Sequence, residues 1–171
     1  MTAIPAAPEA IIPGPDTQRA FRDALGSYAT GVTVITTEID GGETVGITAN
    51  SFAALSLEPA LVLWSPARSS RRFAIFAEAT EFRIHVLAAD QMALARHFTT
   101  SSTPPAEGLG PVLARFDCKR HAVHEGGDHA IVVGQVLRFS HHAGAPLIFH
   151  GGRFGQLDLS GSPLDSGYAA R

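Results

Sequence analysis

The chain has 171 residues, of which 45% are hydrophobic and 17% are charged, and its formal net charge is −3. This length and composition fit one globular domain with a sizeable core, and the slight acidity argues against a broad nucleic-acid-binding surface. No segment approaches the ~20 consecutive apolar residues that a membrane-spanning helix needs. The one cysteine, Cys118, excludes an internal disulfide. A lone cysteine favours a reducing compartment, so we expect a cytoplasmic protein without membrane contact.

The two ends of the chain differ in composition from its middle. Residues 1–15 contain four prolines and no sustained apolar stretch, which predicts a flexible tail rather than a signal peptide. Ser, Gly and Pro dominate beyond Leu159 and predict a second tail over residues 160–171. The domain therefore covers residues 16–159.

Three helices are expected. Asp16 or Thr17 can cap the first, in which Phe21, Leu25 and Tyr28 recur at i, i+4 and i+7 and form one apolar stripe. The second begins at Ser69 or Ser70 and carries Phe73, Phe76 and Ala77 on one side, and the third is capped by Asp90 and reaches Phe98. The following residues, 99–110, read as a loop.

Strands outnumber these helices. The expected strands cover residues 31–39, 43–49, 60–65, 82–87, 116–124, 128–139 and 146–150. Glycine pairs at 41–42 and 126–127 give two of the joins the chemistry of a hairpin, and residues 60–65 are apolar enough to be buried on both faces. Hairpin joins favour an antiparallel sheet, and closure into a small barrel would remove its exposed edges.

The stretch from Gly46 to Phe52 changes from an alternating strand to small hydroxyl and amide residues without a charge. Val45, Ile47 and Ala49 share one face of this strand, and Thr48 points to the other. Asn50 and Ser51 then offer hydrogen bonds where the strand ends. This surface suits a neutral aromatic ligand rich in carbonyl and hydroxyl groups, although an ordinary strand-ending turn has the same composition.

Further polar clusters interrupt the apolar strands at Thr30–Thr33, at Ser65 with Arg68–Arg72, and at Gly127–His129. The arginines and serines of the second cluster, placed where a helix begins, form the best candidate site for a phosphate. A serine cap with solvated arginines is the more ordinary explanation of the same residues. His129 lies next to a Gly-Gly hairpin, so it either contacts a ligand at the rim or is an ordinary surface histidine.

Several other chemistries have no support in the sequence. His121 and His124 are three residues apart on a strand and face opposite ways, and no HExxH or paired-cysteine motif is present, so no metal is expected. A GxSxG nucleophile turn is absent. Neither GxGxxG nor GxxxxGK[ST] occurs, so any dinucleotide is not held by a Rossmann turn.

Ordered motifs over residues 17–157 resemble the short-chain flavin reductase family, whose members serve two-component flavin monooxygenases. The motifs are Phe21–Thr37, Gly46–Phe52, Ser56–Pro59, Gly127–His129, and Pro146–Phe149 followed by Gly152–Leu157. The resemblance implies a mainly β split barrel with flanking helices. It also implies a homodimer that binds FMN or FAD and uses NADH or NADPH to reduce it, passing the reduced flavin to a monooxygenase component.

The resemblance also implies roles for individual residues. The isoalloxazine and ribityl chain would contact Thr30, Thr33, Thr48, Ala49, Asn50 and Ser51. The phosphate side would be held by Ser65, Arg68, Ser69 and Ser70, and the nicotinamide would be bordered by His129. This division agrees with the chemistry of the residues, because neutral donors face a neutral ring system and the basic segment faces the anion.

Two positions depart from the family pattern. His85 stands where Asn is common, and Phe154 stands where Tyr is common. The resemblance places both among the cofactor-binding residues, and either could alter nicotinamide access or flavin preference. These departures leave room for a flavin-storage or flavin-sensing protein without useful nicotinamide binding. A flavin oxidase acting directly on a small amine or phenol is a third possibility.

Overall fold

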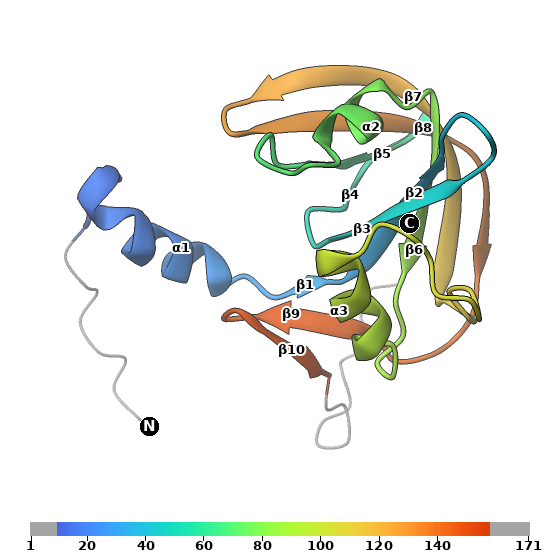
Figure 1. Cartoon of the computed structure of the whole chain (residues 1–171). Helices are drawn as coiled ribbons and strands as arrows, with labels where there is room; N and C mark the ends of the chain where they lie inside the picture. Colours follow the sequence, from blue (N-terminus) through green and yellow to red (C-terminus); the bar gives the residue numbers. More distant parts are fainter. Residues whose placement is uncertain (1–9, 158–171) are drawn as a thin grey trace.

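The computed structural model describes residues 10–157, so the expected C-terminal tail and most of the N-terminal one lie outside the described residues. Ten strands and four helical segments follow in the order η1 (Pro15–Thr17), α1 (Gln18–Gly26), β1 (Thr30–Gly31), β2 (Thr33–Glu38), β3 (Thr44–Ala49), β4 (Ala53–Leu57), β5 (Ala60–Trp64), α2 (Phe73–Glu78), β6 (Glu81–Val86), α3 (Met92–Thr100), β7 (Ala114–Gly126), β8 (His129–His141), β9 (Leu147–His150) and β10 (Arg153–Gln156) (Figure 1).

Seven strands form one antiparallel sheet in the order β3-β2-β6-β7-β8-β5-β4. Laid flat, its two end strands would lie about 29 Å apart at ~4.8 Å per strand. Yet β3 and β4 are joined by residues 50–52 alone, a link that spans about 14 Å at most. The sheet must therefore curl into a barrel that is not hydrogen-bonded between β3 and β4. This confirms the split, antiparallel barrel expected from the sequence.

A separate three-stranded sheet, β1-β9-β10, lies beside this barrel. The expected strand 31–39 is divided between the two sheets, because Val32 bonds to Leu147 and Leu87 instead of continuing one ladder. Strands β4 and β10 were not expected from the sequence. Neither has a clear alternation of buried and exposed residues, because β4 is largely exposed and β10 has only four residues.

Two apolar clusters hold the fold together. The interior of the barrel contains Trp64, Phe76 and Phe82 with the aliphatic residues around them, and Phe76 brings α2 into this cluster. The second cluster lies on the outer side of β2, where α3 contributes Ala95 and Phe98. Strand β5 alternates, with Val62 and Trp64 buried and its other residues partly exposed, so the expectation that both its faces are buried was wrong.

The helix starts differ from the expected ones. Helix α1 begins at Gln18, and the Thr17 hydroxyl bonds to Gly14 and Ile12 instead of capping it. Helix α2 begins at Phe73 rather than at Ser69 or Ser70. Helix α3 follows Gln91, so Asp90 does not cap it, and the Gln91 side chain ties Ala88 to Leu109. Serine and aspartate are common in turns as well as at caps, and the sequence alone did not distinguish the two.

Candidate functional site

The Asn50–Phe52 link crosses the split of the barrel, between the two strands that are not paired with each other. The alternation expected for β3 is confirmed, because Ile47 and Ala49 pack against the barrel interior while Gly46 and Thr48 face α3. The Thr48 hydroxyl donates to the Ala95 carbonyl at 2.6 Å. The strand that leads into the split is therefore fixed from both faces.

Hydrogen bonds fasten the split to the end of β5. The Ser65 backbone N–H donates to the Ser51 hydroxyl oxygen at 2.9 Å, and the same hydroxyl donates to the Ser65 carbonyl at 3.2 Å. Nearby, the Thr33 hydroxyl donates to the Ala49 carbonyl at 2.7 Å. Since these hydroxyls already have partners, ligand contacts at the split would come from the exposed Asn50 side chain and from backbone groups.

The segment after β5 lies directly beside the β7–β8 turn. Ala67 forms an isolated bridge with His129, and the Arg68 N–H donates to the Asp128 carbonyl at 2.8 Å. The residues expected to hold a phosphate, Ser65 and Arg68–Ser70, lie at least 57 positions before the Gly-Asp-His motif in sequence, and the two segments are thus adjacent in space. Together with the Asn50–Phe52 link they form one continuous region, which we call the split site: residues 50–51, 65, 67–70 and 128–129.

Arg68 and Ser69 are the residues of the split site whose side chains could hold an anion. Because α2 starts only at Phe73 and has six residues, the 67–72 segment is a turn and not the start of a helix. Arg68 stacks over the Phe73 ring, and its guanidinium reaches Glu125 and Gly127 of the opposite turn. The Ser70 hydroxyl accepts from the Arg72 N–H. A phosphate would meet one guanidinium and the hydroxyl and backbone N–H of Ser69, because the Arg68 and Ser70 N–H groups already donate to the Asp128 and Ala67 carbonyls.

Arg72 has a structural role. Its guanidinium donates to the carbonyls of Gly46, Phe98 and Ser101 at 2.8–2.9 Å and to that of Thr99 at 3.2 Å. Three of these carbonyls belong to the last turn of α3 or the residue after it, where helical partners are missing. Burial lowers the pKa of Arg72. Arg72 therefore joins α3 to β3, and its guanidinium is already occupied.

His129 stands at the rim of the split site with a carboxylate beside it. Its Nδ1 lies 2.7 Å from an Asp128 oxygen, and both side chains are accessible. The hydrogen bond from His129, and then its charge, lower the pKa of Asp128. The bond fixes the ring and leaves Nε2 free to face a ligand.

His85 lies away from this rim, on β6. It is buried, and its Nε2 is 2.9 Å from the Thr36 hydroxyl on the neighbouring strand β2. Burial first, and then the charges of Arg115 and Arg83, lower its pKa to about 4, against the opposing effect of Asp117. His85 is therefore a neutral residue of the sheet, with no hydrogen bond to the split site.

Thr30 and Phe154 lie in the small sheet, where both flank Phe149. Phe154 packs against Phe149 with ring centroids 5.4 Å apart, and Arg96 lies over its other side at 5.8 Å. The Thr30 hydroxyl is buried without a hydrogen-bond partner within residues 10–157. A buried hydroxyl without a partner is costly, and a bound ligand would satisfy it. This orphan and the neutral donors of the split site fit a flavin.

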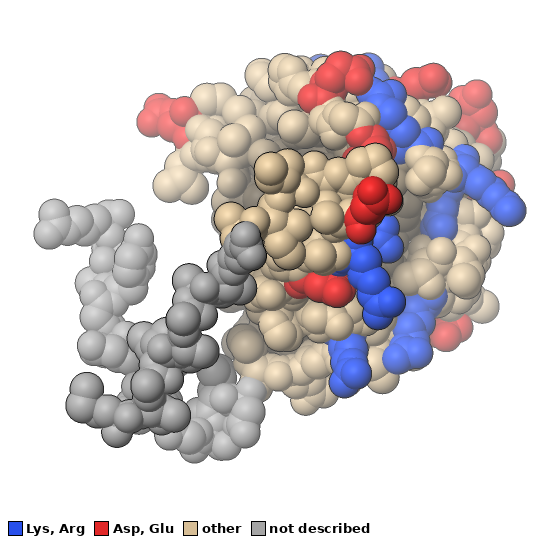
Figure 2. Space-filling view, turned by 90° about the vertical axis from the view of Figure 1, so that its left-hand side faces the viewer, with Lys and Arg blue, Asp and Glu red and all other residues tan. Residues whose placement is uncertain are grey.

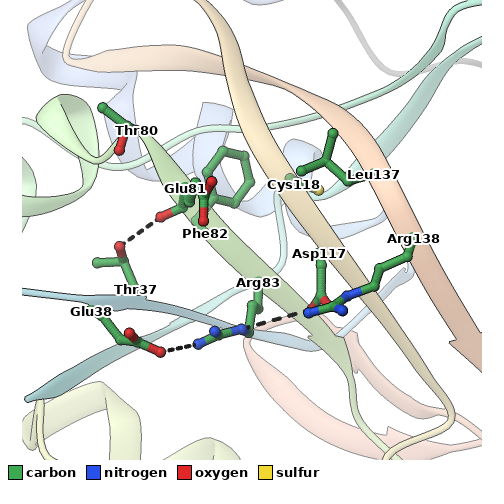
Figure 3. A pocket seen from close by; sticks show the side chains of 10 residues that line it. All are labelled: Thr37, Glu38, Thr80, Glu81, Phe82, Arg83, Asp117, Cys118, Leu137 and Arg138. Carbon is green, nitrogen blue, oxygen red and sulfur yellow. Dashed lines mark hydrogen bonds and ion pairs between the residues drawn. The ribbon is translucent and has the colours of Figure 1, made fainter. Parts of the chain in front are cut away.

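Two cavities, of about 380 and 300 Å³, lie on another part of the barrel and are lined by none of the split-site residues. They surround Asp117, whose carboxylate accepts from Arg115 and Arg138. Arg83 lies 3.8 Å from this carboxylate and is itself paired with Glu38 (Figure 3). Burial tends to raise the pKa of Asp117, but the two hydrogen-bonding arginines outweigh it and hold that pKa below its usual value. No sequence pattern indicates this network, because its members come from four strands whose register only the structure shows.

Within residues 10–157, no group of three or more His, Cys, Asp and Glu side chains is placed to hold a metal ion. None of the described helices is long and apolar enough to cross a membrane. Glu125 is a site residue that the sequence does not single out, because its contact with Arg68 depends on β7 lying beside the 67–70 segment.

Comparisons with known proteins agree with this geometry. A family described as "Flavin reductase like domain" matches residues 25–158. FMN reductase (NADH) SmoA of Agrobacterium fabrum is 49% identical over 157 residues, which cover 85% of this chain and 90% of that protein. The reductase subunit HsaB of a flavin-dependent monooxygenase from Rhodococcus jostii is 39% identical over 149 residues, covering 80% and 76%.

A solved structure shows the same fold. NADH:FAD oxidoreductase SgcE6 of Streptomyces globisporus C-1027, in complex with NAD and FAD fragments, superimposes with a TM-score of 0.78 at 31% identity and covers 90% of this chain and 100% of its own. The split barrel, the motifs that meet at its opening and the match over most of the chain lead to one conclusion: this protein belongs to the flavin reductase family.

Proposed function

We propose that this protein is an NAD(P)H-dependent flavin reductase that transfers a hydride from NADH or NADPH to FMN or FAD and passes the reduced flavin to a partner monooxygenase. The observation that carries the proposal is the split site, where neutral donors, one arginine and the Asp128–His129 pair meet. In the overall reaction, one reduced nicotinamide and one proton reduce one oxidised flavin. Bound nicotinamide and flavin supply the redox chemistry, and the protein supplies binding and orientation.

Different residues of the site suit different parts of the flavin and the nicotinamide. Asn50 and the backbone of residues 48–51 suit the carbonyl and N–H edge of a flavin ring, and Thr30 offers a further hydroxyl. Arg68 and Ser69 suit the phosphate. His129, oriented by Asp128, suits the carboxamide or ring of the nicotinamide. Ala67 and His129 are bridged, so both ligands would be held by one rigid junction.

No nucleophile is required for this reaction. The sole cysteine, Cys118, lies in the barrel interior, where burial, followed by the charge of Asp117, raises its pKa to about 12. It is therefore an unreactive core residue at neutral pH. A buried free thiol agrees with a cytoplasmic location, which we also propose.

The flavin-sensing alternative gains no support from the structure. It rested on His85 and Phe154, and neither has a hydrogen bond to the split site: His85 bonds to Thr36, and Phe154 packs on Phe149. The Asp128–His129 pair at the rim favours an enzyme.

The decisive experiment follows the absorbance of NADH and NADPH with FMN, FAD and riboflavin in turn. We expect oxidation that depends on added flavin, with at least one nicotinamide and one flavin giving steady turnover. A protein that binds flavin without any flavin-dependent oxidation of either nicotinamide is a flavin-binding protein and not a reductase.

We also propose that the protein is a homodimer. Its α1 helix has nine residues, none of them buried, and projects from the body (Figure 1). A helix this short is unstable in water unless its apolar side is covered. Seen from the side of α1, the centre of the described surface consists mostly of uncharged residues (Figure 2). A second copy of the chain, bringing equivalent surfaces together about a twofold axis, would cover them.

Further apolar side chains are exposed on the barrel itself. Leu57 at the end of β4 is 97% exposed, and Phe139 on β8 is 72% exposed. Phe139 stacks on Phe116, which in turn contacts Phe52 at the split, so an apolar surface continues from the split site outward. A dimer that covers this surface would lie next to the flavin.

A further inference from the structure

Arg68 is held by a carboxylate where a phosphate is proposed to bind. Its Nη2 donates to Glu125 Oε2 at 2.5 Å, and its Nε donates to the Gly127 carbonyl at 3.3 Å. Glu125 lies near the end of β7, and Gly127 lies in the turn that joins β7 to β8. The remaining terminal nitrogen, Nη1, has no hydrogen bond to the described residues.

The ion pair between Glu125 and Arg68 can be broken at little cost. Its side chain is 87% exposed, and that of Arg68 is 39% exposed, so the pair is largely solvated. Exposed ion pairs contribute little stability, whereas a phosphate dianion forms stronger, charge-assisted hydrogen bonds with a guanidinium. The phosphate also gains the Ser69 hydroxyl and backbone N–H, which Glu125 does not contact.

The two anions cannot share Arg68 without a penalty. A carboxylate beside a bound phosphate brings like charges together on one guanidinium, and their repulsion weakens the ligand. Phe73 limits how far the guanidinium can move, because Arg68 is stacked over its ring at 5.1 Å. Arg68 must therefore exchange one anion for the other within a small space.

We infer that Glu125 is a specificity-determining residue that occupies Arg68 in the free enzyme and competes with the phosphate of FMN or the pyrophosphate of FAD. This inference rests on the proposed function and on Arg68 as its phosphate contact. Glu125 lowers the affinity for phosphorylated flavins and leaves riboflavin unaffected. The consequence is a site that releases flavin readily, as a reductase that hands its product to another protein requires.

The experiment measures the dissociation constants of FMN and riboflavin by flavin fluorescence with the full chain. The variants are Glu125→Gln, Arg68→Ala and the double variant, with Glu43→Gln as a control that removes one exposed acidic charge from the β2–β3 hairpin. Glu125→Gln keeps the shape of the side chain and should tighten FMN by about threefold to fivefold, the upper range for an exposed ion pair. Riboflavin affinity should change less than about twofold, and Glu43→Gln should leave both affinities unchanged within the same margin.

The double variant separates competition from simple repulsion. If Glu125 acts by occupying Arg68, its replacement in the Arg68→Ala background should change FMN affinity by less than about twofold. Three results would each overturn the inference. They are a threefold to fivefold gain in FMN affinity from Glu125→Gln in the Arg68→Ala background, an equal gain in riboflavin affinity, and no gain in FMN affinity from Glu125→Gln alone. NADH oxidation by the wild-type protein tests the proposed function separately, because its outcome does not depend on the ratio of the two affinities.

Discussion

At the scale of single residues, burial decides what each histidine does. His85 and His129 were both assigned to ligand binding by resemblance, yet one lies inside the sheet and the other lies at the rim of the split site. A buried histidine close to Arg83 and Arg115 is held neutral, and an accessible one beside Asp128 is free to meet a ligand. The two residues therefore give different, separable phenotypes.

His85 should make the protein less stable in mild acid. Its pKa is about 4 in the folded protein and about 6.5 when unfolded, so its contribution is present above pH 6.5 and is lost as the pH falls towards 4. Between pH 7.5 and 5.0 this residue alone should lower the free energy of unfolding by about 2 kcal/mol.

Urea unfolding at the two pH values checks this. In the variant His85→Gln, the amide can still bond to Thr36. The free energy of unfolding of this variant should therefore fall by about 2 kcal/mol less between pH 7.5 and 5.0 than that of the wild type. Replacement of the exposed His124 by Gln is the matched control, and it should show the same decrease in the free energy of unfolding as the wild type. Equal losses in wild type and His85→Gln would mean that His85 does not carry the effect.

His129 should affect the nicotinamide more than the flavin. We expect His129→Ala to raise the KM for NADH or to lower kcat, because a ring fixed by Asp128 at the rim would orient the second ligand. Flavin affinity should stay within about threefold, less than the effect of one ordinary hydrogen bond. The measurement pairs steady-state kinetics with flavin fluorescence. Loss of flavin affinity with normal turnover at saturation would assign His129 to the flavin instead.

At the scale of elements, α3 holds the strand that leads to the split site. Gly46 of β3 faces the ring of the fully buried Phe98, and a Cβ at this position would lie only 2.3 Å from the nearest ring atom. The Gly46 N–H and carbonyl bond to Ser102 and Arg72. The first residue of the motif that suggested a flavin is therefore there for packing.

Gly46→Ala should destabilise the protein by about 1–3 kcal/mol, the usual cost of overpacking a core that cannot relax. Thermal or urea unfolding measures the loss, and Gly155→Ala on β10, where a Cβ meets no atom within 4 Å, is the matched control. Flavin affinity should fall as well, because Phe98 pushes against the strand before Asn50. A variant as stable as wild type would show that α3 shifts without cost.

At the scale of the whole molecule, the exposed apolar surfaces argue for a second copy. Phe21 and Leu25 lie on α1 as the sequence predicts, but the helix ends at Gly26, so Tyr28 follows it and the expected helical stripe is incomplete. All three side chains are at least 49% exposed, and none is buried by residues 10–157.

Leu25→Glu and Leu57→Glu should each weaken the dimer by about tenfold or more, since each places a charge within the proposed interface. Both side chains are exposed in the single chain, so the fold of each subunit should persist. Sedimentation equilibrium across a range of concentrations measures the effect, and Met92→Glu on α3 is the control. A wild-type protein that is monomeric at micromolar concentration would contradict the homodimer.

Some of this protein was determined by the sequence alone. The alternation of residues 44–49 set which side chains face the barrel, because successive residues of a strand point to opposite sides. Gly41, Gly42 and Gly127 supply the positive φ of the two hairpin turns, whereas Gly126 does not have a positive φ. Local chemistry of this kind needs no distant partner, and the family resemblance rested on such motifs in order.

Tertiary structure decided the rest, because it depends on which distant residues meet. Ser70 and Asp90 could cap helices or lie in turns, and packing placed them in turns. Arg68 and Arg72 are neighbours of the same type, but one meets the β7–β8 turn at the split site and the other meets the end of α3. Register and curvature of the sheet bring those partners within hydrogen-bonding distance, and no pattern within the 68–72 segment encodes them.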